Sequence, residues 1–165
     1  MNENTDIVNE EYIKETIDDL YMVFLINNQK YALSSKYIIE IIGMLPITQV
    51  PFIPSYIKGI INLRSTIIPV IDARMRFGIE PIDYNERTCI IIIEKGEDKV
   101  GLIVDAVNEV INILPEQSMK MNSKESDIDE NFIKGVSQIN GETQLILDCD
   151  ALIEIVEGIK DGINE

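Results

Sequence analysis

Histidine is absent from this sequence of 165 residues. Without histidine the chain cannot form a Ser-His-Asp triad, a Cys-His nucleophile, a histidine-ligated zinc site or a phosphohistidine relay. Cysteine is scarce as well, because Cys89 and Cys149 are too few for a thiolate zinc site, and their surroundings predict buried free thiols. The sequence also lacks a glycine-rich phosphate loop. We therefore expect no catalytic residue, no metal and no cofactor, which leaves a hydrolase or transferase as the weaker alternative.

Positive charge and long apolar runs are also missing. The chain has 14 Lys and Arg against 29 Asp and Glu, a formal net charge of −15, which opposes binding to nucleic acid and to anionic membrane surfaces. No apolar run approaches the roughly 20 residues of a membrane-spanning helix. The first residues, MNENTDIVNE, lack the basic region and apolar core of a secretory signal. We expect a cytoplasmic protein without direct membrane insertion and without a nucleic-acid partner.

Arginine occurs only between residues 64 and 87. Arg64 separates the apolar runs 59–63 and 67–71, so we expect it in a tight turn between two buried strands, with its stem over apolar surface and its head in solvent. Arg74 and Arg76 are expected to be solvated charges on a helical turn that balance acidic groups.

Short apolar segments separated by turn residues predict a mainly β fold. Strands are expected at 21–26, 30–34, 59–63, 67–71, 88–94 and 99–104, and on both sides of Asn140-Gly141, which favours a type I′ turn. Short helices are expected at 35–42, 73–77, 105–111 and 149–156, with Asp72 and Asp148 as caps. The proline-containing segment 44–56 should be a loop with an edge strand, and 114–131 a polar linker.

The order of these elements repeats. Gly59 and Gly135 are 76 residues apart, and so are Asp72 and Asp148, whereas Glu40 and Glu109 are 69 apart. We therefore expect two small closed barrels related by a pseudo-twofold axis, with a groove between them. The expected subdomains are roughly 21–87 and 88–150, with strands exchanged near the boundary, inside a domain of residues 21–155. Acidic tails are expected at 1–20 and 156–165.

Three segments carry a resemblance to a known family. The stretch YIKGIINLRSTIIPVIDARMRFG at 56–78, VGLIVDAVNEVI at 100–111 and DYNERT at 83–88 resemble the CheW family of bacterial chemotaxis coupling proteins. The resemblance implies two five-stranded SH3-like barrels with short helices and no enzyme activity. It also implies an adaptor that couples methyl-accepting chemoreceptors to the histidine kinase CheA in cytoplasmic arrays at the membrane. The implied partners are the helical hairpin at the receptor tip and the regulatory domain of the kinase.

The same resemblance implies a set of receptor-binding residues: Ile38, Glu40, Arg64, Cys89, Ile90 and Val110. Because Glu40 has a repeat counterpart in Glu109, a shared structural role, by capping or by pairing, is open beside the binding role. The family favours glycine after the arginine, whereas Ser65 follows Arg64 here, so the turn is expected to differ locally. Two related readings also stay open, namely a paralogous coupling protein for another output such as surface motility, and the adaptor part of a receiver-fused protein.

Overall fold

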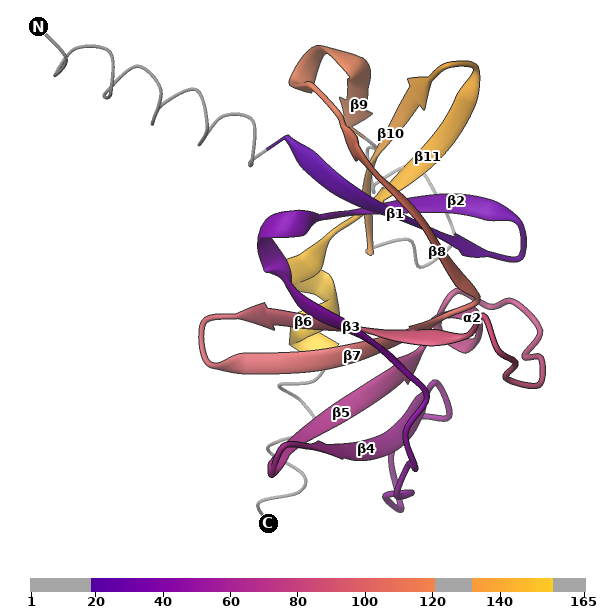
Figure 1. The fold of residues 1–165 in the computed structure, drawn as a ribbon, viewed down its shortest axis with the longest axis vertical. Helices are drawn as coiled ribbons and strands as arrows, with labels where there is room; N and C mark the ends of the chain where they lie inside the picture. Colours follow the sequence, from indigo (N-terminus) through magenta and orange to yellow (C-terminus); the bar gives the residue numbers. More distant parts are fainter. Residues whose placement is uncertain (1–18, 121–131, 156–165) are drawn as a thin grey trace, which may run out of the picture.

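The computed structural model describes residues 19–120 and 132–155, and these form a mainly β protein (Figure 1). The strands are β1 (Leu20–Ile26), β2 (Gln29–Ser34), β3 (Ile38–Gly43), β4 (Ile57–Leu63), β5 (Thr66–Asp72), β6 (Cys89–Lys95), β7 (Asp98–Val104), β8 (Ala106–Asn112), β9 (Ser118–Lys120), β10 (Ile133–Ile139) and β11 (Glu142–Leu147). The helical segments are η1 (Ser35–Tyr37), α2 (Ala73–Arg76), η2 (Pro115–Gln117) and a helix at 149–155. Nearly all of both expected tails, and residues 121–131 of the expected linker, lie outside the described residues.

The strands form two sheets stacked along the long axis of the molecule (Figure 1). One has the order β8-β1-β2-β11-β10-β9 and the other the order β3-β6-β7-β5-β4. The first five strands of each order correspond under the sequence repeat, with β1-β2 matching β6-β7. Each sheet therefore combines one hairpin from one repeat with strands of the other, which are β8, β9, β10 and β11 in the first sheet and β3, β4 and β5 in the second. The ranges 21–87 and 88–150 describe the two repeats, and neither range corresponds to one sheet.

Both sheets curl into barrels in the same way. In the β3–β7 barrel the chain beyond β3 returns to β4, where Thr48 and Ile60 exchange two backbone hydrogen bonds of 2.9 Å. In the other barrel the short strand β9, inside the segment expected to be a linker, pairs with β10. The expected edge strand in 44–56 is thus reduced to a single bridge.

Gly59 and Gly135 occupy equivalent places in these two closures. Each follows a register shift in its hairpin. A Cβ atom on Gly59 would lie 2.0 Å from the Thr48 carbonyl oxygen, and one on Gly135 would lie 2.9 Å from the Met119 carbonyl oxygen. The closing backbone can approach only because a side chain is missing. The predicted duplication is confirmed by these matched environments.

Two of the predicted helices are wrong. Residues 38–43 and 106–112 are the strands β3 and β8, and only the turn Ser35–Tyr37 is helical in the first segment. The serines before Ile38 and the glycine at position 43 resemble the caps of a helix. The apolar pattern of IIEII fits the period of a helix as well as that of a strand. β-branched side chains favour the strand, and pairing with β6 and β1 supplies the backbone hydrogen bonds.

The other two helices and their caps are confirmed. Asp72 accepts a 3.2 Å hydrogen bond from the backbone N–H of Met75 at the start of α2. Asp148 accepts one of 2.9 Å from the N–H of Asp150 at the start of the helix at 149–155. Both aspartates therefore act as N-caps.

The core has three parts. Each barrel holds its own small cluster, and the largest cluster lies between the sheets, where β1, β2, β5, β6, β7 and the helix at 149–155 contribute. Stacked rings cross this central cluster, with centroid separations of 5.9 Å for Phe24–Tyr31, 5.2 Å for Tyr31–Phe77 and 4.3 Å for Phe77–Phe132. Because a fully buried apolar side chain contributes about 1.5–3 kcal/mol, the contact between the barrels stabilises the fold more than either interior.

Candidate interaction surface

The β4–β5 turn places Arg64 at one end of its barrel. Arg64 and Ser65 have φ values of 51° and 69°, close to the 54° and 79° of Asn140 and Gly141 in the equivalent β10–β11 turn. Positive φ at both central positions is the mark of the type I′ hairpin turn predicted for Asn140-Gly141. The Asn62 side chain accepts a 2.9 Å hydrogen bond from the Ser65 N–H. The expected local difference at Ser65 is therefore wrong: the turn keeps its conformation, and Ser65 is held in a strained region.

Arg64 forms a two-pronged ion pair with Glu40 on β3. The guanidinium donates hydrogen bonds of 2.5 Å and 2.9 Å to the two carboxylate oxygens. Hydrogen bonding from Arg64, helped by its charge and that of Lys99, outweighs partial burial and lowers the pKa of Glu40. Strands β3 and β4 are the two edges of their sheet, so the pair joins the edges across the barrel. The side chain of Arg64 remains 72% exposed and that of Glu40 26% exposed.

The other repeat lacks the arginine but keeps a pairing. Glu109 on β8, the counterpart of Glu40, lies 4.0 Å from the ammonium of Lys30, which also binds Glu142. Lys30 corresponds to Lys99, and the counterpart of Arg64 is the uncharged Asn140. The pairing role considered for the two glutamates is thus confirmed, while the arginine fork belongs to one barrel alone.

Ile38, Cys89 and Ile90 lie on the neighbouring strands β3 and β6. Ile38 and Cys89 are partly buried against the central cluster. Burial raises the pKa of the Cys89 thiol, and a backbone hydrogen bond at Val107 of β8 opposes that rise, so Cys89 lies where the two sheets meet. Ile90 is 0% exposed in the interior of its barrel, so it cannot touch a partner while the barrel is closed.

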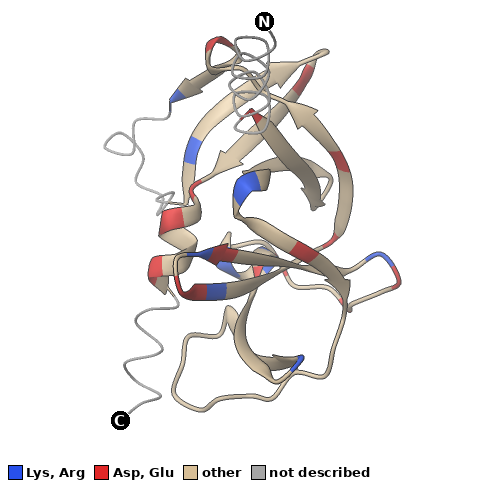
Figure 2. Ribbon diagram, turned by 60° about the vertical axis from the view of Figure 1, so that its left-hand side comes forward, with Lys and Arg blue, Asp and Glu red and all other residues tan. Residues whose placement is uncertain are grey.

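Val110 is half exposed on β8, at the position equivalent to Ile41 of β3. Sequence reasoning missed Ile41, although its 69-residue spacing from Val110 was a usable signal, and it also missed the exposed Ile39 and Ile67. These apolar side chains flank Glu40 and the Arg64 turn in the sequence. Residues 41–57 contain no charged residue. They lie beside β4 and β5 at one end of the molecule, and Figure 2 shows almost no charged residues at that end.

Arg74 and Arg76 are partly buried, so the expectation of solvated charges is wrong, whereas Arg74 balances an acid as expected. Arg74 binds both carboxylate oxygens of Asp105 at 2.7–3.0 Å and donates to the Glu80 carbonyl. Asp105 also accepts a 2.8 Å hydrogen bond from the N–H of Asn27, in the β1–β2 turn of the other barrel. We call Asn27, Arg74 and Asp105 the inter-barrel clasp. The Arg76 guanidinium lies 5.2 Å from the Tyr56 ring centre and 5.1 Å from that of Phe132.

Across 19–120 and 132–155, no set of three or more Cys, Asp or Glu side chains is placed to hold a metal ion. The same residues include no helix long and apolar enough to cross a membrane. Two interleaved barrels with exposed aliphatic side chains around a charged pair define a protein-interaction module.

Comparisons with known proteins identify the family. Residues 20–157 match the CheW-like domain, and the chain belongs to this family. It is 32% identical to the chemotaxis protein CheW of Thermotoga maritima, over 85% of this chain and 90% of that protein. The crystal structure of the scaffolding protein TtCheW from Thermoanaerobacter tengcongensis superposes with a TM-score of 0.73 and 36% identity, covering 79% and 89% of the two chains. The chain is also 31% identical to the chemotaxis protein CheV3 of Helicobacter pylori, over 81% of this chain but 44% of that protein. The predicted pair of SH3-like barrels is confirmed.

Proposed function

We propose that this chain is an adaptor of bacterial chemotaxis, which couples chemoreceptors to their histidine kinase and performs no reaction itself. The carrying observation is the family match over residues 20–157, together with the likeness to a scaffolding protein over most of both chains. The chain would act within receptor arrays beside the membrane.

The proposed receptor surface comprises Ile38, Glu40, Arg64, Cys89 and Val110. Four of them lie on or beside the β3–β7 barrel, and Cys89 approaches β8, which carries Val110. Ile90 is left out because it is fully buried. A helical hairpin at the receptor tip could place its apolar face against this surface, in the manner of helix-in-groove recognition.

The ion pair gives this surface a specific chemistry. Arg64 is largely exposed although its fork is occupied by Glu40, so a carboxylate or helix-end carbonyl of the receptor can share or displace that contact. Arginine suits this exchange because its planar donors match a carboxylate in two-pronged geometry. The kinase regulatory domain would bind elsewhere on the barrels.

A charge-swap series separates recognition by Arg64 from closure of the barrel. Arg64→Glu and Glu40→Arg each place like charges side by side, whereas the double variant restores a pair of reversed polarity. If the receptor reads the arginine, Arg64→Glu and the double variant should both bind a receptor-tip fragment about tenfold or more weakly. Binding to the kinase regulatory domain should stay nearly unchanged. Calorimetric titration against both partners measures these affinities.

Arg87→Glu is the matched control, because it reverses an exposed arginine away from the pair. It should leave both affinities unchanged. Recovery of receptor binding in the double variant would show that the pair only closes the barrel. Equal losses toward receptor and kinase fragments would count against a distinct receptor surface.

A second candidate is an adaptor that serves another output, such as surface motility, or that works beside a further domain. The likeness to CheV3 supports this second candidate, because the matched region makes up less than half of that protein. Affinity capture of the tagged chain from its native cells, followed by mass spectrometry, distinguishes these roles. Recovery of chemoreceptors with the kinase supports the main proposal, and recovery of motility components without chemoreceptors supports the second.

A further inference from the structure

The two barrel interiors differ at matched positions. In the β3–β7 barrel six equivalent positions are all aliphatic and buried: Ile61, Ile68, Val70, Ile90, Ile92 and Ile103. Their counterparts in the other barrel are Ser137, Gln144, Ile146, Tyr21, Val23 and Ser34. The strand registers confirm this correspondence, since Ile61 pairs with Ile68 as Ser137 pairs with Gln144, and Ile90 with Ile103 as Tyr21 with Ser34. One barrel has therefore exchanged aliphatic core for polar groups.

Ser34, Ser137 and Gln144 are deeply buried, and one of them, Ser34, lacks a hydrogen-bond partner for its hydroxyl in the part of the chain that the structure describes. Ser137 donates a 2.8 Å hydrogen bond to Gln144, and the two residues are 1% and 2% exposed. The hydroxyl of Ser34, which is 5% exposed, has no hydrogen-bond partner within the described residues. A buried polar group without a partner destabilises the fold, so the exchange of aliphatic for polar groups calls for a compensating role.

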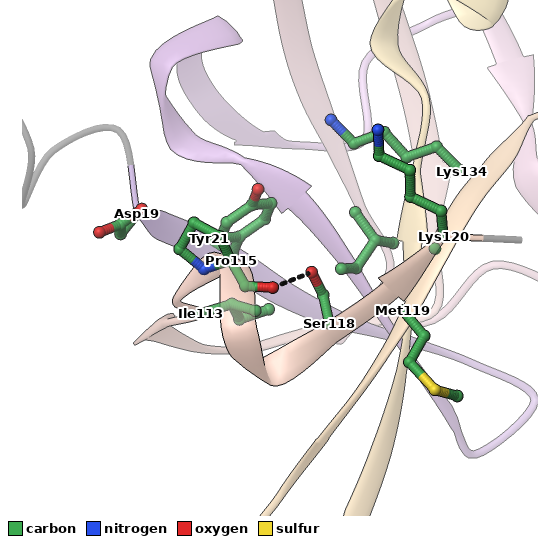
Figure 3. Close-up of a pocket in the computed structure, with 10 residues that line it drawn as sticks. Asp19, Tyr21, Ile113, Pro115, Ser118, Met119, Lys120 and Lys134 are labelled. Carbon is green, nitrogen blue, oxygen red and sulfur yellow. Dashed lines mark hydrogen bonds between the residues drawn. The ribbon is translucent and has the colours of Figure 1, made fainter.

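A pocket of about 320 Å³ opens at the end of this polar barrel (Figure 3). Its lining includes Tyr21 of β1, Ile113, Pro115, Ser118 of β9, and Ile146 of β11. The volume lies at the lower end of the range for small-molecule sites. Apolar side chains make up part of the wall, and the Tyr21 and Ser118 hydroxyls supply polar groups.

Two lysines give the pocket a positive side. Lys120 and Lys134 both line it, their side chains run together in Figure 3, and Asp19 lies on the opposite side. Neither ammonium forms an ion pair within residues 19–120 and 132–155. In a chain of net charge −15, two such ammonium groups beside one cavity would attract an anion.

We propose that this pocket binds a small organic anion, with its carboxylate or sulfonate at Lys120 and Lys134 and its apolar body against Ile113, Pro115 and Ile146. The ring of Tyr21 covers the apolar body, and its hydroxyl is available to donate a hydrogen bond. In the aliphatic barrel the counterparts of Tyr21 and Ile146 are the fully buried Ile90 and Val70, so that barrel does not present the same lining.

The test titrates the full chain with 8-anilinonaphthalene-1-sulfonate, an anion with an aromatic body, and with its neutral analogue N-phenyl-1-naphthylamine. We expect one sulfonate molecule to bind per chain in a saturable titration, measured by fluorescence. Amide shifts in NMR spectra should centre on Tyr21, Ser118–Lys120 and Lys134–Gly135. The neutral analogue should bind about tenfold more weakly, because it lacks the charge-assisted contacts.

Charge reversal tests whether the two lysines hold the anion. The double variant Lys120→Glu/Lys134→Glu should weaken sulfonate binding about tenfold or more, with little change for the neutral analogue. Lys58→Glu is the matched control, since Lys58 is the repeat counterpart of Lys134 in the aliphatic barrel, and it should bind as the unaltered chain does. Thermal unfolding establishes that each variant is folded. No saturable binding, shifts centred elsewhere, or equal affinity for both compounds would overturn the proposal.

Discussion

Ser65 adopts a left-handed backbone conformation that serine disfavours. Its φ of 69° is a conformation that costs an ordinary residue roughly 1 kcal/mol, and glycine occupies the equivalent place in the β10–β11 turn. The register of the β4–β5 hairpin requires the conformation, so the strain falls on Ser65 and the turn keeps its shape. The position of Arg64, one residue earlier, therefore does not depend on having glycine after it.

We predict that Ser65→Gly stabilises the protein by up to about 1 kcal/mol, because it relieves this strain. Urea unfolding of the variant and the unaltered chain measures the difference. Asn140→Gly is the matched control in the other barrel, and it should gain less because asparagine tolerates positive φ. A loss of stability in Ser65→Gly would mean that the serine side chain contributes more than its backbone strain costs.

The candidate residues show how far a sequence specifies a site. Arg64 was placed correctly in a turn between buried strands, because the flanking apolar runs and their spacing are local signals. Its partner Glu40 lies 24 residues away on the opposite sheet edge, and only closure of the barrel brings the two together. Ile90 and Cys89 are neighbours on β6, yet only Ile90 is fully buried. β6 has a core cluster on each face, so its sequence shows no alternation that would mark an exposed side.

At the scale of elements, the hairpins could be predicted and the crossing strands could not. Asn140-Gly141 defines a turn by its own backbone preferences. β3 and β8 instead take their conformation from strands remote in the sequence, since β3 pairs with β6 and β8 pairs with β1. Their local sequences also resemble capped helices. Pairing with distant strands therefore determines that these segments are strands, and a short stretch of sequence does not contain that information.

The inter-barrel clasp joins three such elements: the β1–β2 turn, α2 and the β7–β8 junction. Burial of Asp105 favours its neutral form. Hydrogen bonds from Arg74 and from the Asn27 N–H, with the charge of Arg74, outweigh that burial and hold the pKa of Asp105 below its ordinary value. A lowered carboxyl pKa stabilises the folded state above the unfolded value near 4, and the contribution is lost as pH falls through the folded pKa.

We predict that Asp105→Asn destabilises the protein by about 1 kcal/mol at neutral pH, at the low end for charged hydrogen bonds because solvent reaches the pair. The difference from the unaltered chain should begin to shrink as the pH falls below about 4, where Asp105 of the unfolded chain becomes protonated, and should be lost as the pH falls through the lower pKa of the folded state. Urea unfolding across a pH series measures both effects. Glu86→Gln, at an exposed loop carboxylate, is the control and should show little change at any pH. A difference that stays constant down to pH 2 would indicate lost packing and not lost charge.

At the scale of the whole molecule, the interleaved topology makes the two barrels one folding unit. Neither repeat contains a complete sheet, because the hairpins β1-β2 and β6-β7 each complete the barrel of the other repeat. The largest buried cluster lies between the sheets and draws residues from both. Splitting the chain between the repeats would therefore expose the apolar surface that is buried between the sheets and inside each barrel.

We predict that fragments 1–87 and 88–165 do not fold alone but fold when mixed. Alone, each would hold one hairpin without its sheet and the outer strands of the other sheet without their central pair, and isolated hairpins are marginally stable at best in water. Mixing restores both sheets and the central cluster, so the β-sheet circular dichroism and the dispersion of the amide NMR signals should return together at equimolar ratio. Unfolding of the intact chain should be a single transition, the same when followed by Tyr21 in one barrel and by Tyr56 beside the other. A dispersed spectrum from either fragment alone, or two separate transitions in the intact chain, would mean that a repeat can build its own barrel, and that the exchange of hairpins is not what holds the two halves together.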